Sequence, residues 1–146
     1  MMECKIIQGD KDPMIQDAYY VRDCVFTQEQ GFPAEIDIDE YDAVAAHCLL
    51  YKDDKIIGTA RLIPQETCGK IGRVAILKEF RGLGLGLVVM EALIVEAQRL
   101  HYDSLNLSSQ VYAVPFYQKL GFEVVGDAYL EDGEPHIMMT KSLRVS

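Results

Sequence analysis

The chain alternates between short runs with the apolar pattern of β-strands and longer segments whose apolar residues recur at helical spacing. Strands are predicted where such runs are bounded by turn residues, namely at Cys4–Ile7, His47–Tyr51, Lys55–Ile63, Lys70–Leu77 and Ser104–Ser109. Two more strands are expected on either side of Glu131-Asp132-Gly133. Asp53-Asp54 predicts a hairpin turn between the second and third runs.

Helices are predicted between these strands. Asp12-Pro13 marks a helix start with proline at the first helical position, and apolar residues follow at helical spacing, namely Met14, Ala18, Val21 and Val25. A longer helix is expected from about Gly84 to His101, and a short one over Val114–Leu120 that ends at Gly121. Residues 31–42 are expected to form a loop.

We therefore expect a single domain, residues 1–146, of the α/β (α+β) class. Its sheet is expected to be mixed and mostly antiparallel, with six to seven strands and helices on both faces. A chain of this length buries enough surface to fold without metals or disulfides.

The composition limits the binding partners and the cellular compartment that can be expected for this chain. The net charge of −9 argues against nucleic acid, which requires clustered Lys and Arg, and is more compatible with a cationic small molecule. The four cysteines are widely spread without a C-x-x-C pair, so we expect reduced thiols and no metal. No long apolar run or signal peptide is present, which predicts a cytoplasmic protein without a membrane partner.

The segment Arg81-Gly82-Leu83-Gly84-Leu85-Gly86 stands between a predicted strand and the start of the long helix. Glycines at alternate positions allow positive φ and close approach of a ligand to the backbone. The amides of such a turn, together with the helix start, favour a polyanion, and Arg81 adds a positive charge. The alternative is a tight connection without a ligand.

Spacing separates the possible nucleotide-binding motifs. A P-loop requires Lys after the last glycine, and no Lys follows Gly86. The dinucleotide motif G-x-G-x-x-G/A requires a third small residue, where this chain has Leu87 or Val89. Neither a kinase-like site nor a Rossmann site is therefore expected.

The pattern R-x-x-G-x-G at 81–86 resembles that of the GNAT superfamily of acyl-CoA-dependent N-acyltransferases. A second family segment, A-x-x-F-Y-x-K-x-G-F, matches Ala113 to Phe122. The amino-terminal third, from Arg22 to Gln30 and on through Pro33, Ala34 and Glu35 to His47, resembles the small bacterial ElaA-like branch. The resemblance implies that acetyl-CoA is the co-substrate and that its contacts come from Val74, Ala75, Ile76, Arg81, Gly82, Leu83, Gly84, Leu85, Gly86, Gln110 and Tyr117.

Aminolysis of a thioester sets the chemistry that the site must supply. A backbone N–H of Val74, Ala75 or Ile76 is expected to hold the negative oxygen of the tetrahedral intermediate. Tyr117 stands at the position of the family's tyrosine and is the expected general acid for the departing thiolate. Its alternative role is that of a packing aromatic residue.

The base that deprotonates the amine stays unassigned at this stage. Many relatives carry an acidic residue where this chain has Gly72. Substrate-side candidates are Arg22, Glu29, Glu35, His47 and His136, and Arg22 is expected either to anchor the loop or to bind an anionic group. The acidic run between Glu35 and Asp42 is expected either to attract an ammonium group or to be a solvated loop.

The sequence thus predicts an N-acetyltransferase that moves an acetyl group from acetyl-CoA to a primary amine of a small molecule or a protein, by direct attack and without a metal. A covalent relay through Cys24 is not favoured by its surroundings. The alternatives are a non-catalytic acyl-CoA sensor and, less favoured, an acyl-homoserine lactone synthase. The chain is expected to be a monomer or a homodimer.

Overall fold

A computed structural model describes residues 1–144 of the chain, apart from the side chain of Ile36, so the last two residues of the expected 1–146 domain lie outside it. Seven strands form one sheet in the order β1-β2-β3-β4-β5-β7-β6. All neighbouring strands are antiparallel except β4 and β5. The strands are β1 (Met2–Gln8), β2 (Ala46–Lys52), β3 (Lys55–Gln65), β4 (Cys68–Ile76), β5 (Ser104–Gln110), β6 (Glu123–Glu131) and β7 (Glu134–Ser142).

Four α-helices connect the strands, and they are α1 (Ile15–Arg22), α2 (Ala34–Asp37), α3 (Leu85–Arg99) and α4 (Val114–Gln118). Helix α1 continues into a π-helical segment, Asp23–Glu29, in which Gln30 N–H donates to Val25 O. The expected loop over residues 31–42 is only partly a loop, because it contains α2 and the start of a 3₁₀ turn, Glu40–Ala43. A capping box between Asp39 and Asp42 stabilises that turn.

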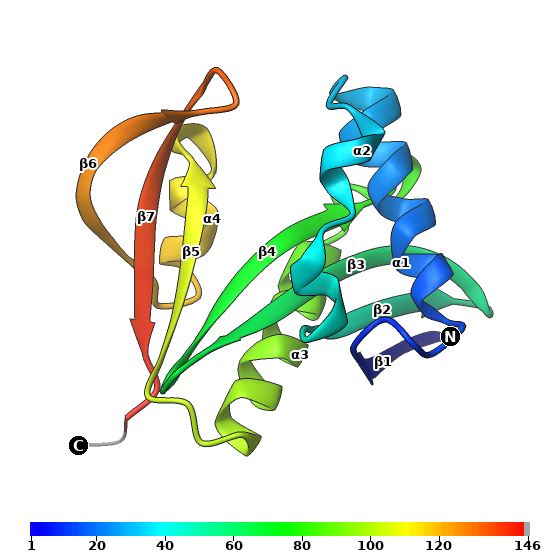
Figure 1. Cartoon of the computed structure of the whole chain (residues 1–146), viewed down its shortest axis with the longest axis horizontal. Helices are drawn as coiled ribbons and strands as arrows, with labels where there is room; N and C mark the ends of the chain where they lie inside the picture. The colour runs from blue at the N-terminus through cyan, green and yellow to red at the C-terminus, as the bar shows by residue number, and fades with distance from the viewer. Residues whose placement is uncertain (145–146) are drawn as a thin grey trace.

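Helices cover both faces of the sheet, as expected from the sequence (Figure 1). The alternation of side chains along β2 shows the division. Cys48 and Leu50 belong to the cluster that α3 covers, whereas Leu49 and Tyr51 belong to the cluster under α1.

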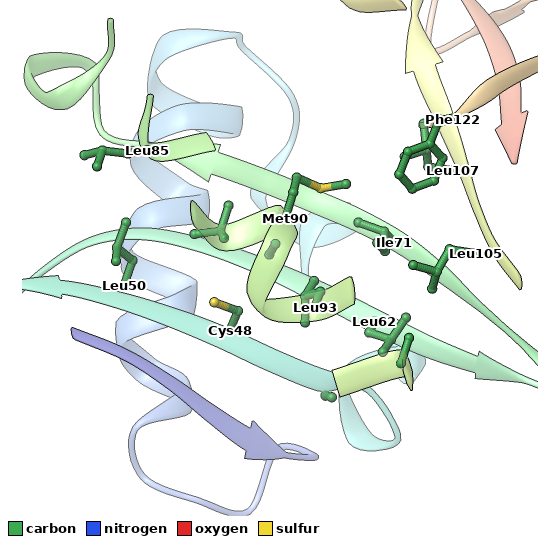
Figure 2. Close-up of a cluster of buried hydrophobic side chains, with 14 of the residues drawn as sticks. Cys48, Leu50, Leu62, Ile71, Leu85, Met90, Leu93, Leu105, Leu107 and Phe122 are labelled. Carbon is green, nitrogen blue, oxygen red and sulfur yellow. The ribbon is translucent and has the colours of Figure 1, made fainter. Parts of the chain in front are cut away.

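Helix α3 provides the centre of the larger core (Figure 2). Val89, Met90, Leu93 and Ala97 are all fully buried and recur at helical spacing. They pack against apolar residues of the sheet, among them Leu62, Ile71 and Leu105, and the same cluster includes Phe122 just before β6. This packing fixes the position of the helix and therefore of its amino terminus.

Strands β4 and β5 pair only over a short stretch and then diverge, which Figure 1 shows as a widening gap between them. Their parallel pairing runs from Cys68 and Ser104 to Ile71 and Leu107. In β4 the bulge opposite Ala60 contains Arg73, whose φ of +51° lies in the left-handed region. A bulge strengthens the local twist, so the second half of β4 follows β3 and leaves β5. The edge of β4 from Gly72 to Ile76 then has no partner strand on the β5 side among the described residues.

We predict that Leu93→Ala lowers the free energy of unfolding by about 3 kcal/mol, because it leaves a cavity in the core under α3. Val95 lies on the same helix but is 63% exposed, so Val95→Ala is the matched control and should change stability by less than about 0.5 kcal/mol. Urea unfolding of both variants measures the difference. Equal losses would mean that α3 does not pack on the sheet through Leu93.

Candidate active site

A cleft of about 1030 Å³ lies where β4 and β5 diverge. Its walls come from the second half of β4, the end of β5, the start of α3, helix α4 and the β6–β7 hairpin. Among the lining residues are Gly82, Gly84, Gln110, Tyr117 and His136. The cleft thus brings together both motifs found in the sequence.

The glycine turn has an irregular backbone that leads into α3. Gly82 and Gly84 have φ values of +81° and +76°, which L residues rarely adopt. A Cβ atom at either position would meet no other atom within 4 Å, so the turn is open on the side where its glycines lack side chains. Helix α3 begins at Leu85 without a side-chain cap and without an acidic residue in its first turn. The free N–H groups and the helix dipole suit a diphosphate.

The other residues of the turn differ from these two glycines. Gly86 is helical, and a Cβ there would lie 3.2 Å from the Phe116 ring, so this glycine allows α3 and α4 to pack closely. Leu85 is buried against the core. Leu83 is 62% exposed and does not line the cleft.

Arg81 is held by two neighbours instead of facing the cleft with a free charge. Its Nη1 and Nη2 donate to the Glu29 carboxylate at 2.5 and 2.6 Å, and its Nε donates to Ile76 O at 2.9 Å. The hydrogen bond from Arg81 lowers the pKa of Glu29. The positive charge expected beside the turn is therefore largely offset by Glu29, and the main-chain N–H groups provide most of the positive potential.

The main chain of β4 alternates in direction along the diverging edge. Leu77 N–H donates to Ile57 O on β3. Because successive residues point to opposite edges, Ala75 also turns its main-chain groups toward β3, while Val74 and Ile76 turn theirs toward β5 and the cleft. Val74 is therefore better placed than Ala75 to present an N–H group there.

Tyr117 lines the cleft and is partly buried. Its ring packs edge-on against Phe116 and Phe122, with centroid distances of 5.0 and 6.1 Å. Burial raises the pKa of Tyr117 to about 12, and the nearby Tyr112 makes a smaller contribution in the same direction. The residue thus packs as an aromatic side chain and also presents a protonated phenol to the cleft.

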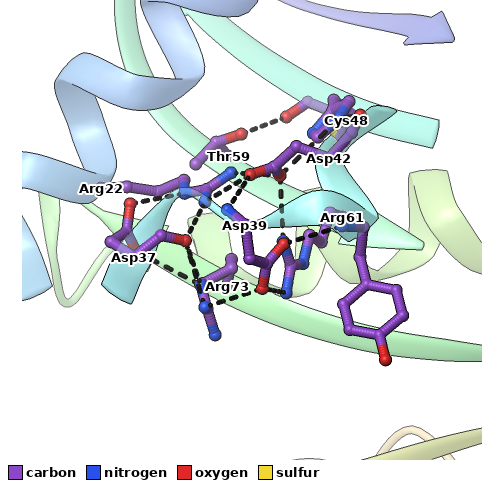
Figure 3. A network of polar contacts seen from close by, with 10 residues as sticks. Arg22, Asp37, Asp39, Asp42, Cys48, Thr59, Arg61 and Arg73 are labelled. Carbon is purple, nitrogen blue, oxygen red and sulfur yellow. Dashed lines mark hydrogen bonds and ion pairs between the residues drawn. The ribbon is translucent and has the colours of Figure 1, made fainter. Parts of the chain in front are cut away.

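Arg22 holds the loop between α1 and β2 from inside the protein (Figure 3). It is 1% exposed, and its Nε donates to Asp37 Oδ2 at 2.9 Å. Its Nη1 and Nη2 donate to Asp42 at 2.8 and 3.0 Å. Of the two roles expected for Arg22, these contacts correspond to anchoring, and the side chain does not reach the cleft.

Arg61 and Arg73 continue this network toward the cleft (Figure 3). Arg61 donates to Asp39 at 2.7 and 2.9 Å and to Asp42 at 3.0 Å, and Arg73 contacts Asp37 and Asp39. We name these six side chains the Arg–Asp network: Arg22, Arg61, Arg73, Asp37, Asp39 and Asp42.

At Asp37, Asp39 and Asp42, the acidic run of the loop therefore does not present free carboxylates that could attract an ammonium group. It is also not a solvated segment at these three positions. Three arginines balance these three carboxylates, which is the usual condition for burying charge. Both sequence-based interpretations were wrong here because a sequence does not show which distant cations meet a loop. Glu35 is exposed and lies outside the cleft lining.

The two histidines expected near the substrate occupy different environments. His47 is 1% exposed, its Nε2 lies 3.0 Å from Asp42 O, and burial lowers its pKa. It does not line the cleft. His136 does line the cleft, opposite Gln110 in the β5–β7 register.

Sequence reasoning missed several residues of this region. Arg61 could have been identified from the sequence, because a lone cation within the apolar strand Lys55–Ile63 requires a buried partner. Ser108, Tyr112 and Glu131 also line the cleft, and nothing in their local sequence marks them. Within residues 1–144 no group of three or more His, Cys, Asp or Glu side chains is placed to hold a metal ion. No helix in this part of the chain has the length and apolar character needed to cross a membrane.

Several proteins with similar sequences or structures are named as acetyltransferases or acyltransferases. A family model described as an acetyltransferase (GNAT) domain matches residues 25–143. The Bacillus subtilis protein YjcF, named an uncharacterized N-acetyltransferase, is 36% identical over 138 residues that cover 94% of this chain and 99% of that protein. Escherichia coli ElaA has a TM-score of 0.87 at 29% identity, with 97% of this chain and 100% of that chain covered. An acyl-CoA N-acyltransferase from Pseudomonas aeruginosa has a TM-score of 0.86 at 28% identity and covers 96% and 99%.

We predict that Gly84→Ala weakens CoA binding about tenfold, because a Cβ in the left-handed region shifts an amide of the turn and costs about 1 to 2 kcal/mol. Gly126 is the matched control, since its φ of +77° and open surroundings are the same but it lies on β6 outside the cleft. Gly126→Ala should lose similar stability and keep its CoA affinity, as measured by calorimetry. Equal affinity in both variants would count against the glycine turn as the phosphate site.

The Arg–Asp network predicts a specific acid sensitivity. Burial would raise the pKa of Asp42, but hydrogen bonds and charge from Arg22 and Arg61 outweigh it and lower the pKa from 3.8 to about 2. The folded pKa lies below the unfolded one, so this contribution is present above about pH 4 and is lost as the pH falls toward 2.

We therefore predict that the wild type loses about 2 kcal/mol of unfolding free energy through Asp42 over this interval, and that Asp42→Asn lacks this loss. Urea unfolding at several pH values measures the two slopes, because the variant is also less stable at neutral pH. The exposed Asp54→Asn variant controls for the change in net charge. Identical slopes in Asp42→Asn and wild type would contradict the prediction.

Proposed function

Since this chain belongs to the GNAT family of acetyl-CoA-dependent N-acetyltransferases, we propose that it acetylates a primary amine of a small molecule or a protein by direct attack on the thioester. The observation that carries this proposal is the shared cleft. The open glycine turn, the edge of β4 beyond its pairing with β5 and Tyr117 all line it. These three elements would hold the co-substrate, stabilise the developing oxyanion and stabilise the leaving thiolate.

The residues present fit acetyl-CoA, which supplies an activated acyl group when bound. Main-chain N–H groups at Gly82, Gly84 and the start of α3 would hold the diphosphate. The cleft-facing main chain of Val74 and Ile76 would pair with the pantetheine arm, which contains amides of its own. Arg81 acts mainly by tying the turn to Ile76 O and Glu29.

The N–H of Val74 would also stabilise the negative oxygen that forms as the amine attacks. A main-chain donor at a bulge is held in place before the reaction begins, so no reorganisation is needed when the charge develops. The left-handed φ of Arg73 immediately before it is a strained conformation. The contacts of the Arg73 side chain with Asp37 and Asp39 help to keep it.

The raised pKa of Tyr117 defines its role more closely. A phenol with a pKa of about 12 is a weaker acid than a thiol with a pKa of about 8.5, so full proton transfer to the thiolate is uphill by about 5 kcal/mol. A hydrogen bond from the phenol to the departing sulfur carries no such cost. We therefore propose that Tyr117 stabilises the leaving group chiefly as a hydrogen-bond donor throughout the neutral pH range.

We predict that the wild type releases thiol from acetyl-CoA in proportion to amine when tested against a panel of primary amines. Tyr117→Phe should lower kcat about a hundredfold, because the leaving group loses its donor. CoA affinity should change by less than about threefold, since the aromatic packing is kept. Tyr20→Phe is the matched control, because Tyr20 is exposed on α1 and lies outside the cleft.

Tight CoA binding without amine-dependent thiol release between neutral pH and pH 9 would contradict the proposal. That result would favour the sensor alternative, for which Gly72 in place of an acidic residue is the supporting feature. Normal turnover in Tyr117→Phe would leave the transferase proposal intact but remove the role of the phenol.

A further inference from the structure

We propose that His136 is the general base of the reaction and that Glu131 stabilises the imidazolium that forms. The inference rests on the proposed acetyl transfer and adds the proton acceptor that it lacks. Both residues lie on the β6–β7 hairpin and line the same cleft as Tyr117.

Hydrogen bonding selects the tautomer of His136. Its Nδ1 lies 2.9 Å from the main-chain oxygen of Glu134. A carbonyl oxygen only accepts, so Nδ1 carries the proton in the neutral ring. The lone pair is therefore on Nε2, the nitrogen that is free to take a proton.

Glu131 is placed to stabilise the protonated form. Its Oε2 lies 3.5 Å from His136 Nε2, so a proton on that nitrogen completes an ion pair. The Glu131 side chain is 46% exposed, which gives the proton a route to solvent after the reaction. A neutral ring gains nothing from this carboxylate, whereas an imidazolium does.

The orientation of the ring is fixed by its neighbours. Tyr129 stacks on it with a centroid distance of 6.4 Å and an interplanar angle of 28°. The Tyr129 hydroxyl is hydrogen-bonded to Ser108 Oγ, which also lies 3.5 Å from Glu131 Oε2. The ionisable groups that face His136 are thus Glu131 and Tyr129 from β6. Its β5 partner, Gln110, is uncharged.

Several other side chains of the cleft could accept a proton, and one of them, Asp132, is exposed at the turn of the β6–β7 hairpin. Asp37 and Asp39 are bound to arginines, and Gly72 has no side chain. His47 does not line the cleft. An imidazole titrates closer to neutrality than a carboxylate and is the better base for an amine at neutral pH.

An alkylamine bound as its ammonium ion first gives one proton to His136 Nε2. The neutral nitrogen then forms a bond to the acetyl carbon, and the C–S bond breaks. The second proton of the nitrogen passes to the departing sulfur, which keeps the electron pair of the broken bond and accepts a hydrogen bond from Tyr117. The imidazolium beside Glu131 then releases its proton to solvent, which restores the neutral ring.

The first test compares two acceptors with acetyl-CoA. One is the most active primary alkylamine of the panel, which is protonated at neutral pH, and the other is hydroxylamine, which is already neutral there. His136→Gln should lower kcat/KM for the alkylamine at least about a hundredfold and for hydroxylamine by less than about fivefold.

Matched variants separate this role from a structural one. Glu131→Gln should also lower kcat/KM for the alkylamine more than for hydroxylamine, but by a smaller factor than His136→Gln, because the imidazolium loses its stabilising carboxylate. His101→Asn removes an exposed histidine at the end of α3 and should leave both rates unchanged. CoA affinity should stay within about threefold of wild type in all three variants, which shows that they fold.

The second test does not depend on activity. The chain has three histidines, so comparing nitrogen-labelled wild type with the His136→Gln variant by NMR identifies the ring signals of His136. We expect neutral His136 as the Nδ1–H tautomer, which leaves Nε2 as the nitrogen without a proton. The opposite tautomer, or equal loss with both acceptors in His136→Gln, would overturn the inference.

A failure of the proposed function and a failure of the base assignment give different results. Wild-type protein that binds CoA but acetylates neither probe contradicts the proposed function, and the base assignment falls with it. Wild-type activity together with an alkylamine rate unaffected by His136→Gln overturns only the base assignment.

Discussion

The structure depends on the end of pairing between β4 and β5. A parallel pair that continued beyond Ile71 and Leu107 would leave neither a cleft nor an open strand edge. The bulge at Arg73 twists β4 away, and the main-chain groups that pairing would have used become available to a ligand. The cleft is therefore a consequence of backbone geometry, and the side chains around it modify a site that the sheet has already formed.

The Arg–Asp network stabilises the bulge at which β4 turns away from β5. A left-handed φ at a residue other than glycine costs about 1 to 2 kcal/mol, and Arg73 adopts it while its side chain contacts Asp37 and Asp39. Arg22 and Asp42 fix the same loop from inside. Because the charges balance, the network gives geometric definition to the bulge and contributes little net field to the cleft.

The cleft divides its chemistry between its two walls. The β4 wall and the start of α3 offer main-chain donors, which suit a diphosphate and a developing oxyanion. The wall formed by β5, β7 and α4 offers titratable side chains, with Tyr117 kept protonated by burial and His136 held in one tautomer. Main-chain donors and titratable side chains thus line different walls of the same cleft.

The sequence by itself predicted the strands along the chain, three of the four α-helices of the described residues, the fold class and the glycine turn, because these depend on local periodicity and on the conformational freedom of Gly82 and Gly84. It also predicted the family, through two motifs that correspond to the glycine turn and helix α4. The tertiary structure alone decided which charges meet. Arg81 pairs with Glu29, which lies 52 residues away, and Arg22 with Asp37 and Asp42. Such pairings, and the difference between His47 and His136, depend on how strands distant in sequence are brought side by side, and local sequence carries no information on that.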